Sequence, residues 1–133
     1  MAETPVRRSE EEWAAALTPE QFRVLRGQGT ERPGSSPLLY ETRDGTYVCA
    51  GCGHVLFESA AKFDSGCGWP SFCEARPGSV IERTDTSHGM VRIEIRCAGC
   101  GSHLGHVFPD GPEPTGQRFC MNGVALGFRP EGD

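Results

Sequence analysis

Two copies of one five-residue pattern decide the fold: Cys49-Ala50-Gly51-Cys52-Gly53 and Cys97-Ala98-Gly99-Cys100-Gly101. Each copy puts two cysteines on one tight turn, where the glycines permit the turn and let backbone amides face sulfur. If the turns converge, the four cysteines offer the tetrahedral thiolate set of structural zinc. The alternative is a redox CxxC beside an incidental pair, but the duplication favours one zinc ion per chain. With all four positions filled by protein, that zinc is scaffold.

The sequence has 133 residues, enough for one domain, which we place at residues 9–133 after a disordered N-terminus over residues 1–8. A formal net charge of −5 disfavours nucleic-acid binding, which normally shows a basic face. The longest apolar run, residues 13–17, is far shorter than the ~20 residues of a membrane span, and the N-terminus lacks a signal peptide's apolar core. We therefore expect a cytoplasmic protein whose seven cysteines serve metal binding or redox chemistry.

Helix signals stand near the N-terminus. Ser9 with Glu12 has the spacing of a capping box and predicts a short helix ending near residue 17. Thr18 with Gln21 repeats that spacing, with proline at the first helical position, and predicts a second helix over residues 19–26.

Strand signals begin at residue 38. The dipeptides Asp44-Gly45 and Asn122-Gly123 are typical of hairpin turns, and residues 91–96 alternate apolar and charged side chains like a half-buried antiparallel strand. The predicted hairpin partners are residues 38–43 with 46–49 and residues 116–121 with 124–128. Residues 129–133 are predicted to be a tail. The pattern indicates a mainly β, antiparallel domain with short helices ahead of it.

Three cysteines remain outside the two CxxC pairs: Cys67, Cys73 and Cys120. In a strand, Arg118, Cys120 and Asn122 project on one face. A guanidinium beside a thiol favours the thiolate, which is the nucleophilic form. An isolated Arg-x-Cys more often marks a buried structural cysteine beside a surface arginine, so the neighbouring motifs decide between the two interpretations.

Two neighbouring motifs supply further groups. His103 and His106 directly follow the second CxxC turn, and their ordinary pKa near neutrality suits general acid catalysis. Asp110 is a candidate to orient one of them. Trp69, between a glycine and a proline, is either a fixed aromatic wall of a pocket or an ordinary core tryptophan.

These motifs resemble, in their order along the chain, those of the B-type methionine sulfoxide reductases. The resemblance extends from about residue 17 to residue 128 and rests on the two CxxC pairs and four further segments. These segments are GCGWPSF (66–72), Ser87-His88-Gly89-Met90, HLGHVFPDG (103–111) and Arg118-Phe119-Cys120. The resemblance implies two small antiparallel β-sheets in a tent-like arrangement, with short N-terminal helices. It also implies a four-cysteine structural zinc site away from the active site.

The resemblance further implies the reaction, which is reduction of the R epimer of methionine sulfoxide in oxidised proteins, a repair made necessary by oxidative stress. Cys120 corresponds to the family's nucleophile, and Arg118 would stabilise its thiolate while Asn122 supports the geometry. His103 and His106 correspond to the family's two active-site histidines. Of these, we expect His103 to protonate the sulfoxide oxygen. Trp69 would form the apolar pocket for the substrate's methyl group.

The family also implies a recycling step. After attack, Cys120 becomes a sulfenic acid, a second thiol condenses with it to an intramolecular disulfide, and thioredoxin reduces that disulfide. Some members use the cysteine of the GCGWPSF-type segment, so we expect Cys67 to be the resolving thiol. Cys73 is its competitor, although a small buried apolar residue is the more usual interpretation of such a cysteine. We expect the protein to act as a monomer.

One stretch departs from the family pattern. Many relatives read Asn-Ser-Ala-Ser-Leu from the second residue after the catalytic cysteine, where this chain has Asn122-Gly123-Val124-Ala125-Leu126. The loss of two hydroxyls puts in doubt the contacts that they would make. Two other functions remain open from the residues. A zinc-dependent binding scaffold would need neither the Arg118–Cys120 face nor the histidine pair. A thiol-handling lyase would need an open coordination position on zinc.

Overall fold

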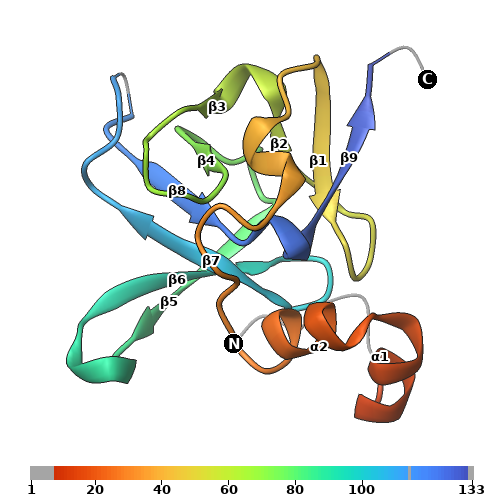
Figure 1. Ribbon diagram of the computed structural model, residues 1–133. Helices are drawn as coiled ribbons and strands as arrows, with labels where there is room; N and C mark the ends of the chain where they lie inside the picture. The colour runs from red at the N-terminus through yellow and green to blue at the C-terminus, as the bar shows by residue number, and fades with distance from the viewer. Residues whose placement is uncertain (1–7, 114, 132–133) are drawn as a thin grey trace.

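The computed structural model describes residues 8–113 and 115–131, which contain two α-helices, nine short strands and four 3-10 turns (Figure 1). In chain order the elements are α1 (Glu10–Ala16), α2 (Pro19–Leu25), η1 (Pro37–Tyr40), β1 (Gly45–Cys49), β2 (Val55–Glu58), η2 (Ser59–Ala61), β3 (Lys62–Phe63), β4 (Ser71–Phe72), β5 (Val80–Asp85), η3 (Ser87–Gly89), β6 (Arg92–Cys97), β7 (His103–Phe108), β8 (Arg118–Met121), η4 (Gly123–Ala125) and β9 (Leu126–Pro130).

Both predicted capping boxes are confirmed. The Ser9 hydroxyl accepts a hydrogen bond from the Glu12 amide at 3.1 Å, and the Glu12 carboxylate accepts one from the Ser9 amide at 2.9 Å. Thr18 and Gln21 make the same reciprocal pair at the start of α2. Each cap contributes about 1 kcal/mol, which matters for helices of only seven residues.

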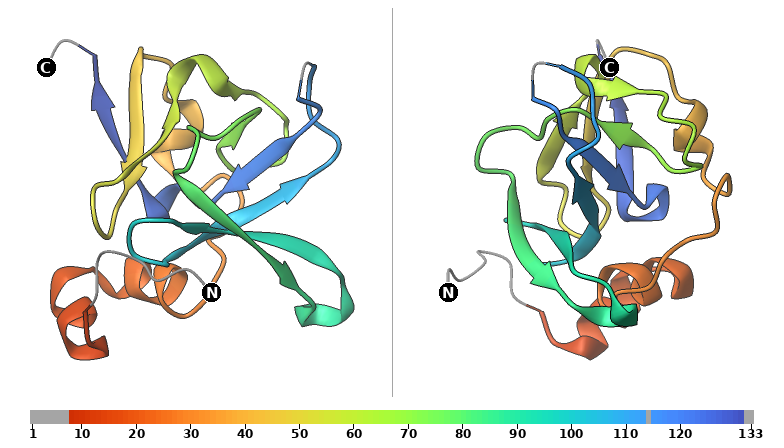
Figure 2. Two further views of the ribbon diagram at one scale, coloured as in Figure 1. Left: turned by 180° about the vertical axis from the view of Figure 1, so that it is seen from behind. Right: turned by 90° about the vertical axis from the view of Figure 1, so that its left-hand side faces the viewer.

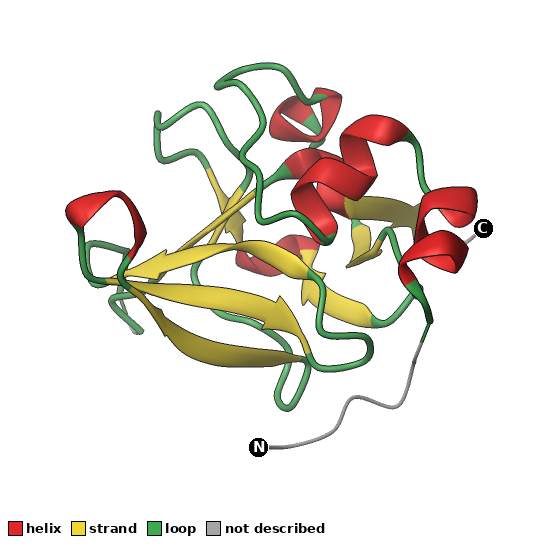
Figure 3. Ribbon diagram, turned by 90° about the horizontal axis from the view of Figure 1, so that it is seen from below, coloured by secondary structure: helices red, strands yellow, loops and turns green. Residues whose placement is uncertain are grey.

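The strands form two antiparallel sheets, as the fold class predicted. A three-stranded sheet has the order β2-β1-β9, and a six-stranded sheet has the order β3-β4-β8-β7-β6-β5. The two sheets meet at an angle, and the β5–β6 hairpin projects away from the other elements (Figure 2). The two α-helices lie together away from the tip of that hairpin, where the 3-10 turn η3 is found (Figure 3).

Aromatic side chains fill the space between the sheets. Phe57 of β2 stacks on Phe72 of β4 with ring centroids 4.2 Å apart, and Tyr47 of β1 meets Phe72 edge-on at 5.0 Å. Phe119 of β8, which is paired with Phe72 in the β4–β8 ladder, meets Phe57 edge-on with ring centroids 5.8 Å apart. All four are buried, so this cluster joins the sheets by apolar burial.

The two predicted hairpins are wrong. Residues 37–40 form the 3-10 turn η1, and β1 pairs with β2 and β9 instead. β8 and β9 lie in different sheets, with η4 between them. The reason at Asn122 is tertiary: its side chain donates to the Leu104 carbonyl and accepts from the Glu31 amide, so it anchors a crossover rather than a turn.

Two smaller expectations also need correction. The strand predicted over residues 91–96 exists as β6, but Glu94 on its charged face is only 3% exposed, because Arg96, Gln28 and His103 surround its carboxylate. The predicted tail is partly strand, since β9 continues to Pro130 and Arg129 pairs with Thr46.

The predicted disordered N-terminus falls, except for Arg8, outside the described residues. The Arg8 guanidinium donates to the Gly51 carbonyl at 3.1 Å and lies over the Trp13 ring. Among residues 8–113 and 115–131, no helix has the length and apolar character needed to cross a membrane.

Close contact between β7 and β8 requires glycine at position 105. A Cβ atom there would lie 2.1 Å from the Cys120 carbonyl oxygen and 2.9 Å from the Met121 Cα. We therefore predict that Gly105→Ala lowers the free energy of unfolding by about 3 kcal/mol or more, because backbone atoms must move apart. Urea unfolding measures the change. Gly127→Ala, whose Cβ would meet only the Val48 side chain at 3.3 Å, is the matched control, and an equal loss in both variants would contradict the prediction.

Candidate active site and metal centre

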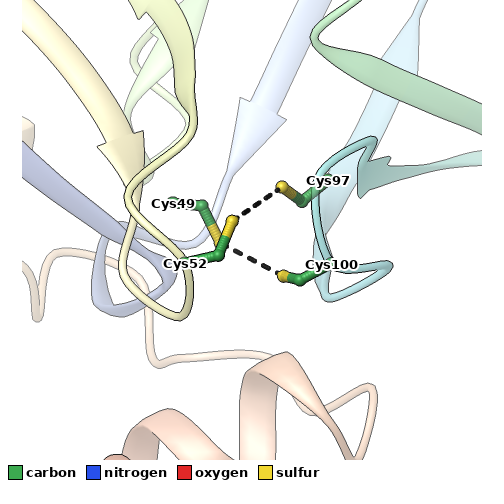
Figure 4. Close-up of side chains that lie close together, drawn as sticks. All are labelled: Cys49, Cys52, Cys97 and Cys100. Carbon is green, nitrogen blue, oxygen red and sulfur yellow. Dashed lines mark hydrogen bonds between the residues drawn. The ribbon is translucent and has the colours of Figure 1, made fainter. Parts of the chain in front are cut away.

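The four cysteines of the two CxxC turns converge (Figure 4). The Cys49 and Cys100 sulfurs lie 3.7 Å apart, the Cys52 and Cys97 sulfurs lie 3.6 Å apart, and all four atoms lie within 4.8 Å of one another. A tetrahedral site with metal–sulfur bonds of ~2.3 Å has sulfur–sulfur edges of about 3.8 Å. The cluster therefore has the dimensions of a four-thiolate metal site.

The local backbone shapes each turn in the predicted way. The Gly51 amide donates to the Cys49 sulfur at 3.3 Å, and the Gly99 amide donates to the Cys97 sulfur at 3.2 Å. Gly53 and Gly101 close the turns with φ values of 79° and 77°, a region that side chains disfavour. One turn joins β1 to β2 and the other joins β6 to β7, so the cluster connects the two sheets.

A separate pocket of about 250 Å³ opens over β7 and β8. It brings together six of the residues singled out in the sequence: Cys67, Trp69, His106, Arg118, Cys120 and Asn122. These six residues supply a pair of thiols, an imidazole, a guanidinium, an amide and an indole, and Arg92 adds a second guanidinium to the lining. This set can support nucleophilic chemistry at sulfur with proton transfer nearby.

The two thiols of the pocket are neighbours. The Cys67 sulfur lies 3.7 Å from the Cys120 sulfur, and all seven cysteines are free thiols. Cys120 stands on β8 with Arg118 on the same face, while Phe119 and Met121 are buried in the core, as the strand prediction required. Burial raises the pKa of Cys120 to about 12, and the neighbouring Cys67 contributes to this increase. Arg118 lowers the pKa of Cys120 by a smaller amount. The resting thiol of Cys120 is therefore protonated.

Arg118 is held in place by two contacts. Its Nε and Nη2 atoms donate to the Asp110 carboxylate at 2.9 and 3.3 Å, and its guanidinium lies over the Phe108 ring at 4.5 Å. Asp110 was expected to orient a histidine and pairs with Arg118 instead, because residues 108 and 118 are opposite each other in the β7–β8 ladder. The arginine is fixed at the pocket and its charge is partly neutralised.

The two histidines occupy different positions. His106 lies directly opposite Cys120 in the β7–β8 pairing and lines the pocket, and its Nε2 atom lies 2.7 Å from the Asp85 carboxylate. His103 is 2% exposed, and its Nδ1 atom lies 2.7 Å from the Glu94 carboxylate. The His103 Nε2 atom has no hydrogen-bond partner among the described residues, and burial lowers the pKa of His103. His106 is therefore the imidazole that can reach a ligand.

Glu31 connects the walls of the pocket. Its carbonyl accepts from the Trp69 indole at 3.0 Å, and its amide donates to the Asn122 side chain at 3.0 Å. Its carboxylate accepts from the Gly123 and Val124 amides at 2.8 and 2.9 Å. Glu31 is 4% exposed, and burial raises its pKa against these hydrogen bonds. One residue thus positions both the indole and the chain that follows Cys120.

The departure from the family pattern at position 123 has a visible cause. A Cβ atom on Gly123 would lie 1.9 Å from the Ser36 hydroxyl oxygen and 2.3 Å from the Ser36 Cβ. That hydroxyl accepts a hydrogen bond from the Leu38 amide at the start of η1. Ser36 therefore occupies the volume of the missing side chain.

The other predicted thiol lies elsewhere. Cys73 is partly buried and packs against the hydrophobic core, and its amide donates to the Ala61 carbonyl. The residue is outside the lining of the pocket over β7 and β8.

Five residues around the site were not found from the sequence: Glu31, Ser65, Ser71, Asp85 and Glu94. Each acts through a contact between segments far apart in the chain or across a loop, such as Glu31 with Gly123 or Asp85 with His106. Glu94 gave one usable signal, because it lies on a strand paired with the histidine strand. The others have no local sequence signature.

A protein-family model described as the SelR domain matches residues 17–130. The chain is similar to the peptide methionine sulfoxide reductase MsrB of Agrobacterium fabrum, with 56% identity over 126 residues that cover 94% of this chain and 93% of the relative. It is 59% identical to the MsrB of Bradyrhizobium diazoefficiens over 93% of this chain and 90% of that protein. The MsrB of Methanosarcina mazei is 54% identical over the whole chain and 96% of its own length.

The lowered pKa of Asp85 predicts how the stability of the folded protein should depend on pH. Hydrogen bonds from His106, and then from Ser87, hold the pKa of Asp85 well below its usual value of 3.8. The folded protein therefore binds fewer protons there than the unfolded chain, so this stabilisation is present above about pH 4 and is lost as the pH falls through the folded-state pKa. Asp85→Asn should lower the unfolding free energy by about 1 kcal/mol at pH 6. This difference between the parent protein and the variant should become smaller as the pH falls toward 2. Urea unfolding across that pH range measures the difference in unfolding free energy, and Asp44→Asn is the control. A difference that stays constant with pH would contradict the prediction.

Proposed function

Because the chain belongs to the SelR-domain family of MsrB peptide methionine sulfoxide reductases, we propose that it reduces the R epimer of methionine sulfoxide in oxidised proteins. The observation that carries the proposal is the 3.7 Å separation of the Cys67 and Cys120 sulfurs in a pocket that His106 and Trp69 also line. Such a pocket supplies a nucleophile, a proton donor, an apolar wall and a second thiol for recycling.

In the first step, Cys120 attacks the sulfoxide sulfur. A sulfur–sulfur bond forms between Cys120 and the substrate while the sulfoxide oxygen is protonated and leaves as water. Water then attacks the Cys120 sulfur, the sulfur–sulfur bond breaks, and the products are methionine and the Cys120 sulfenic acid. One thiol proton and one oxygen atom account for the whole change, because Cys–SH and a sulfoxide give Cys–SOH and a thioether. The protonated resting state of Cys120 is therefore compatible with the reaction, provided that its proton reaches the oxygen.

His106 is the group that we propose for this proton transfer. It faces Cys120 across the β7–β8 ladder, and Asp85 holds its Nε2 atom, so Nδ1 is left to exchange a proton. A cysteine–imidazole pair converts a neutral thiol to thiolate when the proton moves to the ring. This assignment differs from the sequence-based choice of His103, whose burial behind His106 argues for a supporting role.

Selection of one epimer needs three directions around the sulfoxide sulfur to be defined. Trp69, whose indole is fixed by the Glu31 carbonyl, is suited to the substrate's methyl group. Arg118, Asn122 and His106 line the same pocket and can receive the oxygen. The remaining direction is the peptide chain of the substrate, which the open side of the pocket admits.

Recycling uses Cys67 in this proposal. Its sulfur is already beside Cys120, whereas Cys73 packs against the core. The resulting disulfide would be reduced by thioredoxin in the cytoplasm, where the free state of all seven cysteines is expected. We further propose that the protein acts as a monomer and folds as one domain over residues 9–133.

Zinc is the metal that we propose for the four-cysteine cluster. Four thiolates with two amide donors, arranged with near-tetrahedral sulfur spacings, match the preference of zinc for a closed structural site. Cys49, Cys52, Cys97 and Cys100 would hold it. Its contribution is to join the two sheets, and none of the reacting groups above belongs to it.

The roles of the two pocket thiols can be separated experimentally. Cys120→Ser should reduce R-sulfoxide turnover to background, because no nucleophile remains, while retaining the metal and the fold. Cys67→Ser should keep turnover with dithiothreitol but lose more than about 90% of it with thioredoxin, because no intramolecular disulfide forms. Assays of both epimers with each reductant measure this. Activity in Cys120→Ser would refute the nucleophile, and normal thioredoxin turnover in Cys67→Ser would assign recycling elsewhere.

The metal proposal predicts a coupled loss of zinc and stability. Cys97→Ala should lose the metal and lower Tm by roughly 10 °C or more, because binding free energy at such sites is also folding free energy. Elemental analysis and a thermal melt measure both. Cys73→Ala, outside the cluster, is the matched control and should retain one zinc per chain. Full zinc content in Cys97→Ala, or a different metal in the parent protein, would overturn the assignment.

A further inference from the structure

The Cys67 sulfur lies within a network of hydroxyl groups that the reduction step does not use. The Ser65 hydroxyl oxygen is 2.9 Å from the Cys67 sulfur, and the Ser71 hydroxyl oxygen is 3.4 Å from it. The two oxygens are 2.8 Å apart and share a hydrogen bond. Ser71 is 1% exposed and lies directly opposite Cys120 in the β4–β8 pairing. Two hydroxyls therefore face the sulfur in a sheltered position.

The network accommodates both protonation states of Cys67. As a thiol, Cys67 donates to the Trp69 carbonyl at 3.5 Å, and the Ser71 hydroxyl donates to the same carbonyl at 3.2 Å. As a thiolate, the sulfur only accepts, and the hydroxyls of Ser65 and Ser71 can turn their protons toward it. Rotation of a hydroxyl needs no movement of heavy atoms, so the charged state is solvated without rearrangement.

The charges around Cys67 support the ionised state. Burial is the largest single influence and opposes ionisation, but hydrogen bonds with Ser65 and Ser71, and then with the Trp69 backbone and Cys120, together lower the pKa of Cys67 to about 7. The facing groups are the Cys120 thiol, the Arg118 guanidinium and, in the same loop, the Asp64 carboxylate, which accepts from the Gly66 amide. Ser65 and Ser71 are the largest of the groups that lower the pKa of Cys67.

We propose that the hydroxyl groups of Ser65 and Ser71 are catalytic hydrogen-bond donors that hold the Cys67 thiolate ready to attack the Cys120 sulfenic acid. This inference rests on the proposed function. In the step, a bond forms between the two sulfurs and the sulfur–oxygen bond of Cys120 breaks. The oxygen leaves as hydroxide and takes a proton from solvent to become water. Cys67 is oxidised, the sulfenic acid is reduced, and the sulfurs close from 3.7 Å to about 2.05 Å.

The first test measures the ionisation of Cys67 directly. In a Cys120→Ser background, the rate of Cys67 alkylation by iodoacetamide is followed from pH 5 to pH 10 by mass spectrometry of its peptide. Ser65→Ala should raise the midpoint of the curve of alkylation rate against pH by about one pH unit, because one hydrogen-bond donor to the Cys67 thiolate is lost. Ser65→Thr, which keeps the hydroxyl, should restore it. Ser59→Ala removes a hydroxyl on η2 that accepts a hydrogen bond from the Gly45 amide of β1, and it should leave the midpoint unchanged.

The second test measures disulfide formation in the otherwise intact protein. With pre-reduced protein and one equivalent of substrate, methionine release should be unchanged in Ser65→Ala. The rate at which the Cys67 and Cys120 thiols are then lost, relative to the rate in the parent protein, should depend on pH. A thiol with a pKa raised by one unit has fewer thiolates at low pH but is about threefold more nucleophilic when ionised. The variant should be about threefold slower at pH 6, about twofold slower at pH 7 and more than about twofold faster at pH 9.

The change from slower disulfide formation at low pH to faster formation at high pH distinguishes a catalytic hydroxyl from a structural one. A distorted loop would slow disulfide formation at every pH. A midpoint that does not move in Ser65→Ala, or that moves equally in Ser59→Ala, overturns the proposal. A uniform loss of rate across the pH range does so as well. Failure of the proposed function has a different signature: the parent protein would release no methionine, while the alkylation midpoints would still report on Ser65.

Discussion

Attachment of one sheet to the other at four sulfur atoms is the constraint on which the rest of the structure depends. Cys49 and Cys52 belong to the β1–β2 turn, and Cys97 and Cys100 belong to the β6–β7 turn. β7 begins three residues after Cys100 and carries both histidines. The N-terminal helices are attached at the same place, because the Arg26 guanidinium donates to the Cys100 carbonyl. A metal bound at these cysteines would therefore fix the backbone from which the reactive pocket is built, without entering the pocket.

The pocket itself depends on a second constraint, a buried carboxylate. Glu31 uses its amide, carbonyl and carboxylate to hold Asn122, Trp69 and the two amides that follow Asn122. Burying a charge opposes folding, and the two hydrogen bonds that the carboxylate accepts from the Gly123 and Val124 amides partly offset that cost. The arrangement fixes three segments that are distant in the sequence, and it places the indole and the β8 strand on opposite sides of one space.

Features with a local signature were predictable from the sequence. The two capping boxes, the two cysteine turns and the shared face of Arg118 and Cys120 depend on residues a few positions apart, and all are present. The hairpins predicted at Asp44-Gly45 and Asn122-Gly123 failed because long-range partners determine those segments. At Asn122, side-chain contacts with Leu104 and Glu31 replace the turn.

In the site too, features with a local sequence signature were predictable and features set by long-range contacts were not. The motif order located the residue types, but the partner of each histidine is a carboxylate from the neighbouring hairpin, at Asp85 or Glu94. That pairing depends on the strand register, including the irregularity between Ile95 and Arg96. The depth of His103 relative to His106 has the same origin, so a sequence pattern of two histidines three positions apart does not distinguish the buried ring from the accessible one.

The close approach of Ser36 to Gly123 limits which residues position 123 can carry. The serine side chain occupies the volume that a larger residue at position 123 would need, and it also caps the η1 turn. A single replacement at position 123 would therefore collide with the loop before any compensating change could arise. A larger residue at position 123 therefore requires a paired change at Ser36 or a shift of the loop that carries it.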